Sequence, residues 1–127
     1  MQITFLGLGG VLCALAIAGG AFGAHGLAER LAARELALWE TAARYLFYGG
    51  LGLALVGLAA GQLPRESFTA SGWCLLAGSL VFSATVALLA LGGPRSLGAV
   101  TPIGGVLMIL GFALFAWTAL RATVGAG

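Results

Sequence analysis

Polar side chains with the potential for chemistry gather between residues 25 and 45. His25 is the only histidine of the chain, and Glu29 follows it by four residues, about one turn of a helix. An imidazole beside a carboxylate can bind a metal ion or transfer a proton. One histidine and one carboxylate are too few ligands for a metal, so we predict no metal site.

A second polar group begins a little further along the chain. Glu40 and Arg44 have opposite charges at a spacing that makes them neighbours on a helix, and Tyr45 follows directly. An arginine near hydrocarbon is costly and is usually paired or extended toward the interface. Two interpretations remain open: an interfacial ion pair that sets the depth of the helix, or a buried polar cluster that joins His25 to these three residues.

The rest of the sequence lacks the combinations that catalytic sites need. Aspartate is absent, which excludes a Ser-His-Asp set. The glycines do not follow a predicted strand, so no phosphate-binding loop is indicated. Cys13 and Cys74 lie in different apolar segments without a Cys-x-x-Cys spacing, which is typical of small core residues. We predict no catalytic residue and no cofactor, and we expect that the protein is not an enzyme.

The composition predicts an integral membrane protein. The chain is 61% hydrophobic and 8% charged, whereas soluble domains carry about 25% charged residues. Its mean hydropathy is +1.08. A helical span needs roughly 20 apolar residues to cross ~30 Å of hydrocarbon. Four such spans are predicted in one domain of residues 1–127, at about residues 3–24, 41–61, 68–91 and 100–120.

These spans predict an all-α fold, an integral membrane four-helix bundle, because a bilayer offers unpaired backbone groups no partner. The first span lacks a basic segment before it, so we expect it to be retained rather than cleaved as a signal peptide. The first link, residues 25–40, is longer than the others and carries five charges. It is interpreted as a short amphipathic helix, as an extension of the second span, or as a solvated connector.

Small residues at helical spacing predict close contacts between helices. The candidate packing positions are Gly19, Gly23, Gly57, Gly61, Gly104 and Gly105. They either pack the four helices of one chain or form the face of a homo-oligomer. Thr101 and Pro102 predict the start of the fourth helix, because threonine caps helices and proline suits the first turn.

Motifs along nearly the whole chain resemble those of a known family. They are Gly20-Ala-Phe-Gly-Ala-His-Gly-Leu27, Trp39, Thr41, Tyr45, Phe82-Ser83 and Thr101-Pro-Ile-Gly-Gly105. This pattern resembles domain-of-unknown-function family 423, whose animal relatives are called transmembrane protein 256. The resemblance implies a small four-span protein of the bacterial inner (plasma) membrane, and it implies no reaction.

The chain departs from the family pattern at two places. Gly49 stands where relatives often carry a histidine. The segment Phe82-Ser-Ala-Thr-Val-Ala87 stands where relatives often read Phe-Ser-Gly-Ser-Leu-Tyr. These departures argue against any mechanism that needs a second histidine.

The sequence favours a structural or accessory membrane protein that packs in the lipid bilayer with itself or with another membrane protein. Alternatives are a small carrier or channel for an ion or polar solute, and a protein that binds a lipid or quinone. The few hydroxyls within the spans favour the accessory class over a channel. A nucleic-acid partner is not expected, because the six basic side chains are spread along the chain.

Overall fold

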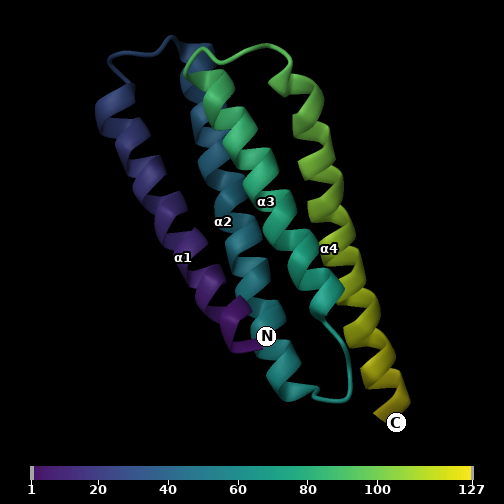
Figure 1. Cartoon of the computed structure of the whole chain (residues 1–127). Helices are drawn as coiled ribbons and strands as arrows, with labels where there is room; N and C mark the ends of the chain where they lie inside the picture. The colour runs from purple at the N-terminus through teal and green to yellow at the C-terminus, as the bar shows by residue number, and fades with distance from the viewer. Residues whose placement is uncertain (1, 127) are drawn as a thin grey trace.

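The computed structural model describes the backbone of residues 2–126 and the side chains of residues 4–125. The described chain forms four long helices, α1 (Gln2–Phe22), α2 (Ala33–Gln62), α3 (Thr69–Ala90) and α4 (Leu97–Ala126) (Figure 1). A π-helical turn, η1 (Gly23–Leu27), continues α1. All four helices are long and apolar enough to cross a membrane. The all-α fold predicted from the composition is therefore confirmed.

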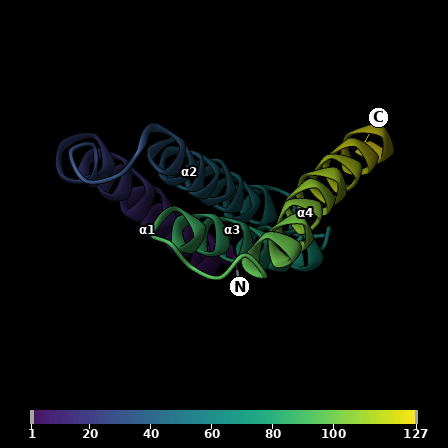
Figure 2. The same ribbon diagram turned by 90° about the horizontal axis from the view of Figure 1, so that it is seen from above.

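Helices that are neighbours in sequence are also neighbours in space. α1 packs along α2, α2 along α3, and α3 along α4, so two helical hairpins join through α2 and α3. Seen from above, α1 and α4 lie at opposite ends of the assembly (Figure 2). The two outer helices therefore leave most of their surfaces to lipid or to a partner.

The first link resolves into a turn followed by the beginning of α2. Residues 28–32 form the turn, and α2 begins at Ala33, well before the predicted span. The segment Ala33–Glu40 consists largely of alanine, leucine, arginine and glutamate, which favour helix. With 30 residues, α2 is roughly 45 Å long and exceeds the hydrocarbon thickness of ~30 Å. Three of the five charged residues of the link, Arg34, Glu35 and Glu40, thus lie in an extension of the second helix, whereas Glu29 and Arg30 lie in the turn.

The loop between α3 and α4 begins with a left-handed glycine. Gly92 has a φ of 89°, and the amide of Gly93 donates to the carbonyl of Leu88 at 2.7 Å. This is the Schellman arrangement, in which glycine meets no steric penalty and the last helical carbonyls gain donors. α3 therefore ends sharply, and the chain reverses toward α4.

The structure corrects the helix start predicted at Thr101 and Pro102. α4 begins at Leu97, so Pro102 lies beyond the first turn, inside the helix. Its missing N–H leaves the carbonyl of Gly98 without its usual helical donor. The hydroxyl of Thr101 lies 2.6 Å from that of Thr85 on α3 and does not cap a helix end. The prediction was wrong because residues 97–100, which were expected to lie before or at the helix start, also adopt helical geometry.

The buried apolar core lies near the N-terminal end of α1. It consists of Phe5, Leu12, Leu53, Val56, Phe68 and Leu75. The ring of Phe5 occupies the space that a Cβ at Gly72 would need, and it meets Trp73 edge-on with ring centroids 5.5 Å apart. These contacts hold α1 against α3 at this end, whereas a groove separates the two helices nearer to η1.

Candidate functional site

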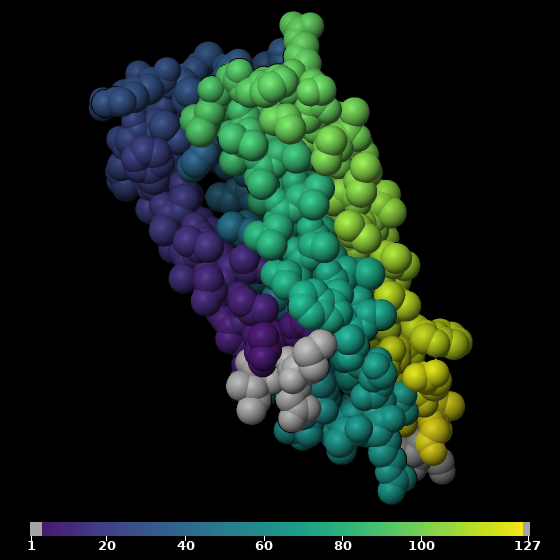
Figure 3. Space-filling view, viewed as in Figure 1, coloured from purple at the N-terminus to yellow at the C-terminus, as the bar shows by residue number. Residues whose placement is uncertain are grey.

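A groove opens between α1 and α3 where these helices diverge, and α2 forms its floor (Figure 3). Its volume is about 240 Å³. Small apolar side chains dominate its walls, so it suits an apolar occupant. We call it the α1–α3 groove, and it is lined by Leu15, Ala16, Gly19, Trp39, Ala42, Ala43, Leu46, Leu80, Ser83, Ala84 and Ala87.

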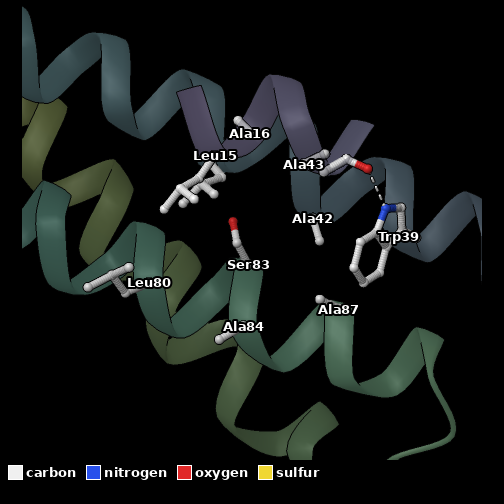
Figure 4. Close-up of a pocket in the computed structure, with 11 residues that line it drawn as sticks. Leu15, Ala16, Trp39, Ala42, Ala43, Leu80, Ser83, Ala84 and Ala87 are labelled. Carbon is white, nitrogen blue, oxygen red and sulfur yellow. Dashed lines mark hydrogen bonds between the residues drawn. The ribbon is translucent and has the colours of Figure 1, made fainter. Parts of the chain in front are cut away.

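The hydroxyl of Ser83 is the polar group that faces into the α1–α3 groove (Figure 4). Ser83 is 6% exposed, and its Oγ has no hydrogen-bond partner among the described residues. Two other buried serines of α3 differ in this respect: Ser71 donates to the carbonyl of Gly111 at 2.7 Å, and Ser79 to that of Leu75 at 2.6 Å. A buried hydroxyl without a partner costs free energy, so Ser83 could hydrogen-bond a group that enters the groove.

Trp39 closes the groove at the end nearest η1. Its Nε1–H donates to the carbonyl of Gly19 at 2.8 Å, as the dashed line in Figure 4 shows. The indole packs so closely on Gly23 that a Cβ there would lie 2.5 Å from its Cδ1 atom. Phe22 meets the same indole edge-on, with ring centroids 6.3 Å apart. Gly23, in the glycine-rich motif of residues 20–27, therefore leaves the space that the indole of Trp39 occupies.

We expect Gly23→Leu to lower the free energy of unfolding by roughly 1–3 kcal/mol, because the new side chain overlaps the anchored indole. Thermal unfolding in detergent, followed by circular dichroism, measures this loss. Gly61→Leu is the matched control, since a Cβ at Gly61 meets no atom within 4 Å. If Gly23→Leu is as stable as the native protein, the inference that Gly23 leaves space for the indole of Trp39 is contradicted.

The polar residues predicted as a cluster do not form one. His25, Glu29, Glu40, Arg44 and Tyr45 are all exposed, which corrects the buried-cluster interpretation. Glu40 and Arg44 also make no ion pair among the described residues, as the interfacial ion-pair interpretation would require. The reason is helix rotation: positions 39, 42 and 46 of α2 face the groove, so residues 40 and 44 point away from it.

Two of these residues nevertheless have identifiable surroundings. His25 lies in the π-helical turn η1 with its side chain exposed. The ring of Tyr45 lies against Phe82 of α3, with centroids 4.7 Å apart, and against Tyr48 at 5.2 Å. Tyr45 therefore packs on the outer surface of α2 and α3 rather than in a polar site. Among the described residues, no group of three His, Cys, Asp or Glu could hold a metal ion.

The predicted packing glycines have different environments. A Cβ at Gly104 would lie 2.5 Å from the backbone nitrogen of Phe82, whereas one at Gly105 would only touch the ring of Phe82 at 3.7 Å. Gly57 is buried in α2. A Cβ at Gly19 or Gly61 would meet nothing within 4 Å, so neither glycine is needed for close packing within the chain.

Other glycines make the closest contacts between helices. A Cβ at Gly49 would overlap the side chain of Ser79, and one at Gly9 would lie 2.5 Å from the carbonyl oxygen of Gly50. Sequence reasoning missed these positions because glycine is abundant, with 22 in the chain, and spacing alone does not reveal which face meets a neighbour. The sequence distinguishes Ser83 from the other hydroxyl-bearing residues of the spans by no signal, because no pattern shows that its oxygen lacks a hydrogen-bond partner.

Residues 19–105 match the family model described as Protein of unknown function (DUF423). The chain belongs to this family. The resemblance predicted from the motifs is thus confirmed, and the matched region holds the whole α1–α3 groove except Leu15 and Ala16.

Relatives of the DUF423 chain are named membrane proteins. A UPF0382 membrane protein of Staphylococcus epidermidis is 41% identical over 93% of this chain and 96% of its own length. A UPF0382 membrane protein of Staphylococcus saprophyticus is 43% identical over 86% of this chain and 90% of its own length. A UPF0382 membrane protein of Bacillus subtilis is 36% identical over 93% of this chain and 97% of its own length. No solved structure matches the chain. With its four apolar helices, the chain is a membrane protein of unknown biochemical activity.

Proposed function

We propose that this DUF423 protein is a structural or accessory component of the bacterial plasma membrane that packs with itself or with other membrane proteins. The observation that carries the proposal is the apolar interior of the bundle. Its buried polar residues, among those described, are the hydroxyl-bearing Ser71, Ser79, Ser83, Thr85 and Thr118. Ion and solute pathways in membranes are usually lined by charged or strongly polar groups, which these hydroxyls do not supply.

The charged side chains support the same proposal. Except for Glu40 and Arg44, which lie seven and eleven residues into α2, each of them lies near a helix end or in a link. None is a fully buried residue, although one carboxylate oxygen of Glu35 is buried without a partner among the described residues. The one ion pair among the described residues, between Arg121 and Glu66 at 2.8 Å, joins the end of α4 to the link between α2 and α3. We assign no catalytic activity to the chain, because its charged groups are dispersed and all but the half-buried Glu35 and Glu66 are exposed.

The outer helices offer the surfaces that an accessory role requires. In the apolar windows of α1 and α4, 22% of residues are buried within the chain, against 39% in α2 and α3. The lipid-facing side of α1 carries the small residues Gly7, Gly10 and Ala14, which are all exposed. Small residues allow helices to approach closely in lipid, where association relies on packing. This face suits contact with a second helix.

The proposed location in the plasma membrane rests on two observations. The relatives compared are bacterial membrane proteins, and the chain provides four helices of spanning length. Helical spans satisfy their own backbone groups within hydrocarbon, whereas proteins of bacterial outer membranes are typically barrels.

Purification from native membranes in a mild detergent, combined with an ion-flux assay in liposomes, tests the proposal. We expect a stoichiometric membrane-protein partner or a discrete homo-oligomer, and liposomes no more permeable to K⁺ and H⁺ than protein-free liposomes. A homo-oligomer that conducts ions would contradict the accessory role, and so would a monomer without a partner.

A further inference from the structure

The α1–α3 groove is not filled by side chains of the chain itself, and its shape and composition suit an apolar ligand. It lies on helices of membrane-spanning length and opens sideways between α1 and α3 (Figure 3). An occupant would therefore enter from the bilayer. Its volume of about 240 Å³ exceeds that of an engineered cavity of ~150 Å³ that holds benzene. A six-membered ring with a short substituent therefore fits.

The walls of the groove favour a flat occupant. Ala16 of α1, Ala42 of α2 and Ala84 and Ala87 of α3 present only methyl groups, and the indole of Trp39 closes one end (Figure 4). Surfaces built from alanine are smooth, so an aromatic or quinonoid ring can contact them over its whole face. The indole ring adds a face or edge for contact with a second ring.

The hydroxyl of Ser83 gives the groove its one unsatisfied polar group. Its Oγ is buried and without an acceptor among the described residues, although Ser79 one turn earlier bonds the carbonyl of Leu75 on its own helix. An occupant with a carbonyl oxygen would accept a hydrogen bond from Ser83. An occupant of hydrocarbon alone would leave the hydroxyl unpaired, which costs free energy.

The depth of Ser83 separates two kinds of carbonyl-bearing lipid. α3 has 22 residues and is roughly 33 Å long, close to the hydrocarbon thickness of ~30 Å. Ser83 precedes the last residue of α3, Ala90, by seven positions, so it lies roughly 10 Å from the nearer end. The ester carbonyls of a phospholipid lie at the membrane interface. To reach Ser83 they would have to move roughly 10 Å deeper into the hydrocarbon. The carbonyls of a lipid-soluble ring can lie at this depth.

We propose that the α1–α3 groove binds the ring of a membrane quinone, with the hydroxyl of Ser83 donating a hydrogen bond to one ring carbonyl. The isoprenoid or alkyl tail leaves the groove sideways into lipid. This binding is independent of whether the protein also acts as an accessory component, because it uses the α1–α3 groove and not the outer face of α1.

Trp39 provides the measurement, because it lines the groove and quinones quench indole fluorescence at short range. The full-length chain with Trp73→Phe and Trp117→Phe retains Trp39 as its single tryptophan. This protein is placed in phosphatidylcholine nanodiscs and titrated with decylubiquinone. We expect quenching that saturates, since a bound quinone would contact the indole directly.

Three further variants in this background test the site. Gly19→Leu adds a bulky side chain to the wall of the groove at a position where a Cβ meets no atom within 4 Å, and we expect it to abolish saturable quenching. Gly61→Leu has the same open space, on α2, but does not line the groove, and we expect unchanged binding. Ser83→Ala removes the donor and is expected to raise the dissociation constant about three- to tenfold.

Several results would overturn the quinone proposal. Quenching that rises linearly with decylubiquinone, or that is the same in Gly19→Leu, would show partitioning into lipid alone. An unchanged dissociation constant in Ser83→Ala would remove the proposed hydrogen bond. Phosphatidylcholine is in large excess in the nanodisc, so a groove that prefers a phospholipid chain would show no saturable quenching. Detergent unfolding of each variant confirms that a loss of binding is not a loss of fold.

Discussion

Gly104→Ala is expected to destabilise the protein by roughly 1–3 kcal/mol. A Cβ at Gly104 would lie 2.5 Å from the backbone nitrogen of Phe82 and 2.9 Å from the carbonyl oxygen of Gly78. Both atoms belong to the backbone of α3, so no side-chain rotation relieves the overlap. α3 and α4 would have to move apart along a contact that depends on close packing, since lipid provides no hydrophobic force between helices.

Gly105→Ala is the control for this effect. The two glycines are adjacent in α4, and alanine improves helix propensity by up to ~1 kcal/mol at either position. A Cβ at Gly105 meets only the ring of Phe82, at 3.7 Å, which is ordinary van der Waals contact. We expect Gly105→Ala to be neutral or slightly stabilising in unfolding titrations with a denaturing detergent. Equal effects of the two substitutions would show that α3 and α4 do not cross at Gly104.

Gly9→Ala should cause a loss of similar size, roughly 1–3 kcal/mol, in the other hairpin. A Cβ at Gly9 would lie 2.5 Å from both the backbone nitrogen of Ala54 and the carbonyl oxygen of Gly50. On the facing helix, a Cβ at Gly50 would lie 3.0 Å from the carbonyl oxygen of Gly9. α1 and α2 therefore touch backbone to backbone at this point.

Gly10→Ala distinguishes this contact from a general intolerance of α1 to alanine. Gly10 follows Gly9 directly but faces away from α2, and a Cβ there meets no atom within 4 Å. We expect Gly10→Ala to keep the native unfolding midpoint in the same titration, or to raise it through helix propensity. A loss at Gly10 equal to that at Gly9 would place the contact between α1 and α2 elsewhere.

The helical membrane fold was predictable because it depends on local properties. A run of about 20 apolar residues identifies a span, and the links between the runs carry proline, glycine and charge. The helix ends were less predictable. α2 begins at Ala33 and α4 at Leu97, because alanine, leucine and other helix-forming residues continue the helices past the apolar runs.

The candidate site was not predictable in the same way. Sequence reasoning offered the polar residues around His25, Glu40 and Arg44 as a candidate cluster, because titratable side chains are the usual signal of chemistry. Helix rotation turns Glu40 and Arg44 away from the bundle and leaves His25 exposed. The groove instead forms from small apolar residues that carry no such signal, and from Ser83, whose oxygen is buried without a hydrogen-bond partner among the described residues.

Composition and the length of the apolar runs were sufficient to identify a four-span membrane protein, since a bilayer accepts only helices or closed barrels and these runs are apolar on all sides. The motifs were sufficient to identify the family. Only the packing of the helices decided which glycines bear contacts: Gly104 and Gly105 are equivalent in the sequence, yet one meets backbone and the other a ring edge. Contacts of this kind, and the α1–α3 groove with them, depend on how each helix is rotated and where helices diverge. The rotation of each helix and the points where helices diverge depend on packing between residues that are distant in the chain. The local sequence does not specify that packing.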